Sequence, residues 1–221
     1  MITKKRRFSV IMSVFDQARE LEEKLPTFLT QEYETGYEVI VIDETSTDDT
    51  SDVLKRFKND YPHLYTTFLP KPNRQAIRKK FAFNLGIKAA KNEWIIFTKV
   101  AKLPAASDLL QAINDAMDDS AELTLGYISK KGIRLQPFAA AEEARLHILR
   151  LERKLDMVHE RTKHHYSWGR YDFIIVRKDH AYDVLKYFEC EANALQTAGW
   201  WISILWSNMI RRPSTTMLLN T

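Results

Sequence analysis

The sequence predicts an α/β protein in which a mostly parallel sheet is flanked by helices. Short apolar runs rich in β-branched residues alternate with longer amphipathic segments through residues 1–120. This regular alternation implies right-handed strand–helix–strand crossovers and therefore parallel neighbouring strands. Polar residues follow the ends of these runs, and ligands of open α/β sheets bind where strands end. The pattern thus predicts both the class and the edge of the sheet that carries function.

The elements of the first half follow from hydrophobic periodicity. Residues 8–15 (FSVIMSVF) form an apolar run bounded by charge, which is typical of a buried strand. The helix expected next, at residues 16–31, places Leu21, Leu25 and Phe28 on one stripe. Polar residues 43–50 end the second strand and can cap the helix after it. The same patterns predict strands at 38–42, 64–69, 94–98 and 123–128, and helices at 51–59, 74–90 and 105–117.

The second half breaks this rhythm. One helical pattern rich in Ala, Glu, Leu and Arg covers residues 137–162. The remaining patterns predict strands at 170–176 and 215–219, and helices at 181–188 and 191–198. Because no linker rich in glycine or serine interrupts the chain, we expect a single domain over residues 1–221, with halves at 1–120 and 121–221.

Composition and charge narrow the function classes. The chain is 45% hydrophobic and 28% charged, which is ordinary globular composition. Its net charge is only +4, and the basic residues form short clusters at 4–7, 78–80 and 211–212. Such clusters are more typical of solvated faces or phosphate contacts than of a duplex-binding surface, so nucleic-acid binding is not expected. The single cysteine, Cys190, excludes an intramolecular disulfide and favours a reducing, cytoplasmic location.

One apolar segment raises the question of a membrane surface. Residues 199–210 (GWWISILWSNMI) are too few to span a bilayer. Three tryptophans beside Arg211 and Arg212 would suit the headgroup boundary of a peripheral protein. An aromatic-rich core segment is the alternative, and the more common use of such residues.

Acids follow the second strand, and bases follow the fourth. Asp43 and Glu44 come directly after the run at 38–42, where a carboxylate can accept hydrogen bonds from a base or ribose. Capping of the next helix by Ser46, Thr47 and Asp48 is the alternative use of this turn. Lys99 and Lys102 follow the run at 94–98.

Three stretches of the chain carry a resemblance to a known family. FSVIMSVFD, YEVIVIDETSTDDT and FAFNLGIKAAKNEWIIFTKVAKLPAASDLL resemble family-2 glycosyltransferases with the GT-A fold, over about the first 115 residues. The resemblance implies that residues 1–120 bind a nucleotide sugar, with a UDP- or GDP-sugar as the donor, and that residues 121–221 face the acceptor. The nucleotide-binding positions it implies are Ser13, Phe15, Asp16 and Asp43. We add Lys79 and Lys99 as basic residues that could meet the diphosphate directly.

The sequence departs from the family at both chemical centres. The family's Asp-Ala-Asp motif, which holds a divalent metal, falls on Lys99, Val100 and Ala101. Hard divalent cations need oxygen ligands, so no metal cofactor is expected. The family's general base, the aspartate of a Glu-Asp-x-Asp-Leu stretch, falls on Ala192, which cannot take a proton. Glu191 is the nearest catalytic substitute and a weak one, and the histidines at 164–165 are further candidates.

Three hypotheses follow from these departures. The first is a glycosyltransferase-like pseudoenzyme that binds a nucleotide, a glycan or a partner subunit. The second is an active, metal-independent glycosyltransferase in which Lys99 or Lys102 meets the diphosphate. Under both, the partners implied are a nucleotide sugar and a glycan or lipid-linked acceptor, as in polysaccharide biosynthesis. The third is a membrane-surface or nucleic-acid-binding module, which rests on a pI of about 9.0 and the segment at 199–210.

Overall fold

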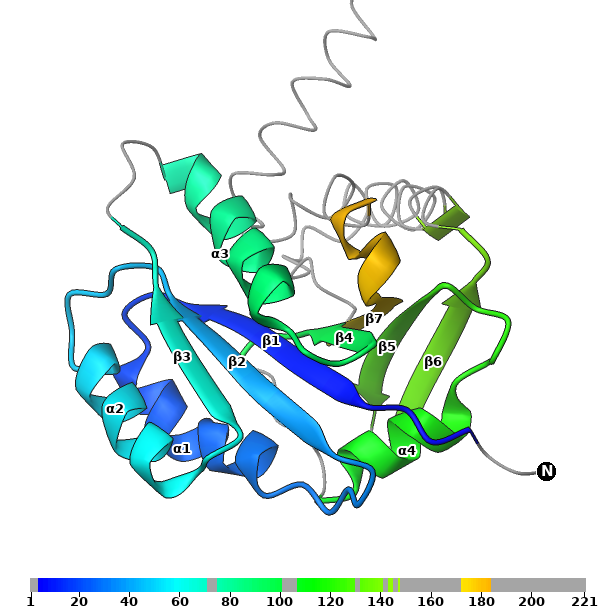
Figure 1. The fold of residues 1–221 in the computed structure, drawn as a ribbon, viewed down its shortest axis with the longest axis horizontal. Coiled ribbons are helices and arrows are strands. Elements are labelled where there is room, and N and C mark those ends of the chain that lie inside the picture. The colour runs from blue at the N-terminus through cyan, green and yellow to red at the C-terminus, as the bar shows by residue number, and fades with distance from the viewer. Residues whose placement is uncertain are drawn as a thin grey trace, which may run out of the picture.

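A seven-stranded sheet organises the protein, in the strand order β3-β2-β1-β4-β7-β5-β6 (Figure 1). The computed structural model describes residues 4–70, 75–100, 107–129, 132–140, 143–144, 147 and 172–183, with backbone alone at 75–80, 129 and 132. The strands are β1 (Phe8–Val14), β2 (Tyr37–Asp43), β3 (Leu64–Phe68), β4 (Trp94–Phe97), β5 (Leu123–Ser129), β6 (Gly132–Phe138) and β7 (Phe173–Arg177). The helices are α1 (Ala18–Leu29), α2 (Thr50–Asp60), α3 (Gln75–Ala89), α4 (Leu109–Ala116) and the short 3-10 helix η1 (Lys178–His180).

The sheet is mixed, with a parallel part and an antiparallel part. Strands β3, β2, β1 and β4 pair in parallel, as the strand–helix alternation predicts. Strand β7 then inserts antiparallel between β4 and β5, and β6 pairs antiparallel with β5. The expected α/β class, a sheet flanked by helices, is confirmed.

Apolar cores fill both faces of the sheet. Alternate residues of β1 point to opposite faces, as in any strand. Val10 and Met12 lie in a core covered by α1, α2 and α4, whereas Ile11 lies in a core covered by α3 (Figure 1). Helix α3 approaches the sheet very closely, because a Cβ added at Gly86 would lie 2.5 Å from Cγ2 of Ile11. Glycine is therefore needed at this position for α3 to pack on β1.

The expected helix at 137–162 is wrong at its start. Pro137 suits the first turn of a helix, but here it lies in β6 and pairs with Thr124 of β5. Strand β6 is the last in the sheet order, and an edge strand tolerates the missing N–H of proline. Residues 143, 144 and 147 are helical, and so are 181–183. The elements expected at 191–198 and 215–219 lie outside the described residues.

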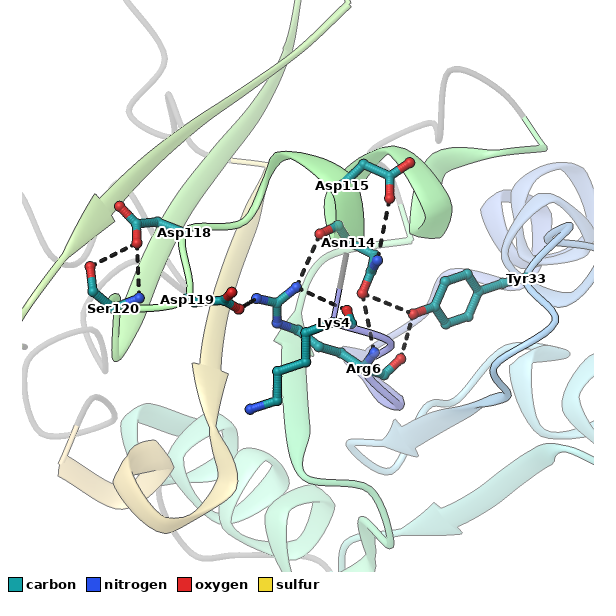
Figure 2. Close-up of polar contacts among 8 residues, drawn as sticks. All are labelled: Lys4, Arg6, Tyr33, Asn114, Asp115, Asp118, Asp119 and Ser120. Carbon is teal, nitrogen blue, oxygen red and sulfur yellow. Dashed lines mark hydrogen bonds and ion pairs between the residues drawn. The ribbon is translucent and has the colours of Figure 1, made fainter. Parts of the chain in front are cut away.

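Arg6 is buried, although the sequence counts it in a charged cluster. Its side chain is 2% exposed, and its guanidinium forms an ion pair with Asp119 (Figure 2). The Nη1 group also donates to the backbone oxygen of Asn114 at 3.1 Å, while the side-chain oxygen of Asn114 accepts from the backbone N–H of Arg6 at 3.1 Å. The Tyr33 hydroxyl donates to the backbone oxygen of Arg6. This cluster ties the start of β1 to α4 and to the turn after α1, and the interpretation of residues 4–7 as a solvated face is wrong at Arg6.

Among the residues that the structure describes, no helix is long and apolar enough to cross a bilayer.

Candidate functional site

The candidate site lies at the carboxyl edge, which we define as the side of the sheet where β1, β2 and β4 end at Val14, Asp43 and Phe97. Strand β7 runs antiparallel to β4, so its first residues lie at this same edge, with Ile174 opposite Phe97. Four neighbouring strands therefore contribute residues to one edge.

The turns after β1 and β2 are joined by reciprocal hydrogen bonds. The backbone N–H of Asp16 donates to the Ser46 hydroxyl at 3.0 Å, and the backbone N–H of Thr47 donates to the Asp16 carboxylate at 2.6 Å. Asp16 has a positive φ of 49°. Aspartate and asparagine tolerate this left-handed conformation better than other side chains. The carboxylate of Asp16 thus serves to order the second turn as well as to line the edge.

Asp43 is 7% exposed and is held by its own turn. Its Oδ1 accepts the backbone N–H of Ser46 at 2.8 Å, and its backbone oxygen accepts the N–H of Leu69 at 2.8 Å. The hydrogen bond to Ser46 is the turn-forming one, and it leaves the other carboxylate oxygen as the group that could meet a ligand.

Asp48 performs the expected capping. Its two carboxylate oxygens accept the backbone N–H groups of Thr50 and Ala18, each at 3.0 Å, so one side chain serves the first residues of both α2 and α1. Desolvation raises the pKa of Asp48, but the hydrogen bonds from Thr50 and Ala18 together outweigh it and lower that pKa below its usual value. Ser46 and Thr47, which the sequence also offers as caps, contact Asp16 instead.

Thr45 adopts a conformation that favours glycine. Its φ is 68°, in the left-handed region, which is unusual for a β-branched residue. Its hydroxyl donates to the backbone oxygen of Leu69, just beyond β3. In the family's usual wording of this turn, Val-Asp-Asp-Gly-Ser-Thr-Asp, Thr45 replaces the glycine, a residue that adopts a positive φ without strain.

Ser13 and Phe15 complete the β1 side of the edge. Ser13 is 8% exposed, and its hydroxyl has no hydrogen-bond partner within the part of the chain that the structure describes. A buried hydroxyl of this kind is unusual enough to be a candidate for contact with a ligand. Phe15 is 39% exposed at the turn.

The exit of β4 carries a cation in place of an acid. Lys99 follows directly after Thr98 and is half-buried, whereas Val100 is 1% exposed. Thr98 is fixed on both sides, because its backbone N–H donates to Ile11 at 3.0 Å and its hydroxyl donates to the backbone oxygen of Asp172 at 2.9 Å. Lys99 is therefore presented at the carboxyl edge by a rigid neighbour.

Asp172 is a half-buried acid at the same edge, and sequence reasoning missed it as a site residue. Its Oδ2 accepts the backbone N–H of Ile128 at 2.7 Å, and its own N–H donates to Gly126 at 2.8 Å. The acids predicted for the site follow strands, whereas Asp172 precedes one. An antiparallel strand brings its first residues to the edge where its parallel neighbours end, which is the signal that could have found it.

The structure brings together some of the expected site residues and does not describe the others. Asp16 and Asp43 lie within one hydrogen-bonded pair of turns, with Ser13 and Phe15 beside them, and Lys99 lies one strand away, after β4. The side chain of Lys79 and the whole of Glu191 lie outside the described residues. No group of three or more His, Cys, Asp or Glu side chains suited to a metal ion occurs among the residues described.

The fold and this edge define an α/β protein of the GT-A-like class. The chain belongs to glycosyl transferase family 2, whose sequence model matches residues 9–172, more than half of its length. The resemblance seen in the motifs is thereby confirmed. Similarity to individual proteins is more limited, and the chain spans only a part of each of them.

A curated relative is the poly(ribitol-phosphate) beta-glucosyltransferase of Bacillus spizizenii, which is 26% identical over 128 residues, 58% of this chain and 19% of the relative. A solved relative is the mannosyltransferase PcManGT from Pyrobaculum calidifontis in complex with GDP-Man and Mn²⁺. It is 29% identical, with a TM-score of 0.47, over 55% of this chain and 35% of that one. TarS 1-349 of S. aureus in complex with UDP is 22% identical, with a TM-score of 0.46, over 53% of this chain and 34% of that one.

Proposed function

We propose that this protein binds a nucleotide sugar along the carboxyl edge without the family's divalent metal, and that it is a glycosyltransferase-like protein impaired in ordinary transfer. The observation that carries the proposal is the contrast between neighbouring strands. The turns after β1 and β2 keep an ordered acidic edge built on Asp16 and Asp43, while the exit of β4 presents Lys99 followed by a buried valine.

The residues at the exit of β4 do not fit a divalent metal. Mg²⁺ and related hard cations take oxygen ligands, and neither the ammonium of Lys99 nor the side chain of Val100 supplies one. An ammonium can meet a diphosphate directly through charge-assisted hydrogen bonds. The edge is thus suited to binding an anionic diphosphate with a protein cation in the place of a metal cation.

The sequence favours impaired transfer over a second active mechanism. The position of the family's general base is Ala192, and the nearest carboxylate is Glu191; both lie outside the described residues. A metal-independent transferase that uses Lys99 is the second candidate, and the half-buried lysine beside the fixed Thr98 favours it. The name of the curated relative favours a role in polysaccharide biosynthesis. A glycan or lipid-linked acceptor is the partner that the family resemblance implies.

The proposal is tested by calorimetric titration of UDP and GDP into the protein with EDTA present. We expect one nucleotide to bind, and Lys99→Ala to weaken it about tenfold, because the diphosphate loses a charged partner. Lys91→Ala is the matched control, since Lys91 is exposed in the turn before β4, away from the carboxyl edge. Binding that needs added Mn²⁺ or Mg²⁺, or no binding of either nucleotide, would overturn the proposal.

Turnover of UDP-glucose and GDP-mannose in EDTA then separates the two candidates. If the protein is a pseudoenzyme, we expect it to bind the nucleotide sugar without releasing UDP or GDP. Release that survives chelation and disappears in Lys99→Ala would instead establish a metal-independent enzyme. Binding of the protein to anionic vesicles is measured as well, because the proposal includes peripheral membrane contact through residues 199–210.

A further inference from the structure

The carboxyl edge carries a second acidic position on the far side of Lys99. Across the strand order β2-β1-β4-β7, Asp43 lies at the end of β2, Lys99 beyond the end of β4 and Asp172 just before β7, with β1 between the first two. Neighbouring strands lie about 4.8 Å apart, so Asp172 is displaced from Asp43 by roughly 14 Å across the sheet. An acid, a cation and a second acid therefore follow one another along a single edge.

This order of charges matches the order of groups in a nucleotide sugar. Such a molecule presents hydroxyls of the ribose, then the anionic diphosphate, then hydroxyls of the sugar. Carboxylates accept hydrogen bonds from hydroxyl groups, and an ammonium pairs with phosphate oxygens. A ligand laid with its ribose at Asp43 and its diphosphate at Lys99 would bring its sugar to the end of β7.

The Asp172 carboxylate is held in place before any ligand arrives. Three hydrogen bonds fix the residue, from its own N–H to Gly126, from Ile128 to its Oδ2, and from the Thr98 hydroxyl to its backbone oxygen. Each carboxylate oxygen has lone pairs for more than one hydrogen bond, so the hydrogen bonds that this carboxylate already makes are compatible with contact to a ligand. Preorganised groups lose little freedom when a ligand binds.

We propose that Asp172 binds the hydroxyls of the donor sugar and distinguishes a nucleotide sugar from the bare nucleotide. The inference rests on the proposed nucleotide-sugar binding and adds the residue that recognises the sugar. A purely structural role, in which Asp172 only satisfies the N–H of Ile128 beyond the end of the β5–β7 ladder, predicts no effect specific to the sugar.

The test compares UDP with UDP-glucose, and GDP with GDP-mannose, by calorimetry on the full chain. We expect Asp172→Asn to weaken the nucleotide sugar about tenfold and to leave the matching nucleotide unchanged. The asparagine oxygen can still accept from Ile128, so the fold should persist. Asp172→Ser is the second variant should the first not fold. Asp179→Asn is the matched control, because Asp179 lies past the opposite end of β7 and pairs with Arg177 at 3.0 Å.

The outcomes separate this inference from the proposed function. Equal losses for nucleotide and nucleotide sugar, or no loss for either, would overturn the role of Asp172 while nucleotide binding stands. Failure of the unaltered protein to bind any of the four probes would overturn the proposed function, and this inference with it.

Discussion

The hydroxyl of Thr98 donates a 2.9 Å hydrogen bond to the backbone oxygen of Asp172, a residue 74 positions further along the chain. Thr98 is 5% exposed, so this bond is made away from water. It joins the exit of β4, where the chain carries Lys99, to the start of β7, where it carries Asp172. The cation and the second acid of the carboxyl edge are thereby placed by one shared contact.

Thr98→Val should therefore destabilise the protein. Valine has nearly the shape of threonine but cannot donate, so the carbonyl of Asp172 loses this part-buried hydrogen bond. We expect a loss of about 1–2 kcal/mol in the free energy of unfolding, measured by urea denaturation. Thr98→Ser keeps the hydroxyl and is the control. A loss in Thr98→Ser with none in Thr98→Val would show that the methyl group, not the hydrogen bond, is what stabilises the fold here.

Thr45→Gly and Thr45→Ala should differ in stability. Both variants lose the hydroxyl that contacts Leu69, but only glycine relieves the positive φ of 68°. A non-glycine residue in this region costs about 1–2 kcal/mol. The greater freedom of glycine in the unfolded chain offsets part of that gain. We expect Thr45→Gly to be the more stable of the two by about 1 kcal/mol in thermal or urea unfolding, and the reverse order would refute the strain.

The positive φ at Thr45 was not predicted, although the motif glycine that Thr45 replaces can adopt such a conformation without strain. Local patterns did not predict the burial of Arg6 either. Arg6 belongs to a run of basic residues, and nothing in the run shows that Asn114 and Asp119, more than 100 residues away, bury one of them. Propensity and periodicity report on neighbours in sequence, so partners brought together by the fold escape them.

Strands β1, β2 and β4 were predictable because each is a short apolar run with buried residues on both faces. Strand β6 was missed because it is an edge strand that contains Pro137, and its burial is only partial. The carboxyl edge followed from strand–helix alternation and the family motifs. To predict Asp172 as a site residue, one must know that β7 runs antiparallel to β4. That direction depends on how the strands are arranged in space.

Asn114→Ala should be costly although no charge is removed. The side-chain oxygen of Asn114 accepts from the backbone N–H of Arg6 at 3.1 Å and from the Tyr33 hydroxyl at 3.3 Å, and Asn114 is 2% exposed (Figure 2). Its loss leaves a buried N–H without its acceptor, at a cost of about 1–3 kcal/mol by urea unfolding. Gln111→Ala, on the exposed side of the same helix, is the control and should stay within about 0.5 kcal/mol.

Gly86→Ala should test how closely α3 lies on the sheet. The new methyl group would meet Cγ2 of Ile11 at 2.5 Å and Cδ1 of Ile42 at 3.1 Å, so the helix or the strands must shift. Overpacking of this kind costs about 1–3 kcal/mol, despite the better helix propensity of alanine. Ile11→Leu removes the methyl group on Cβ that is contacted first. The double variant should therefore lose less than the sum of the single losses, whereas simple additivity would mean that the contact is not limiting.

Asp48→Asn should remove a part of the stability that depends on pH. The folded-state pKa of Asp48 lies below its ordinary value of 3.8, because its hydrogen bonds from Thr50 and Ala18 outweigh desolvation. A depressed folded pKa means that the unfolded chain binds the proton more readily. The carboxylate therefore contributes its full stabilisation above the unfolded pKa, near 4, and loses it as pH falls through the folded pKa. In paired urea titrations from pH 7 to pH 2.5, the difference in unfolding free energy between the protein and Asp48→Asn should be constant above about pH 5 and shrink below pH 4. A difference that does not change over this range would mean that the hydrogen bonds of Asp48 do not favour its charged form.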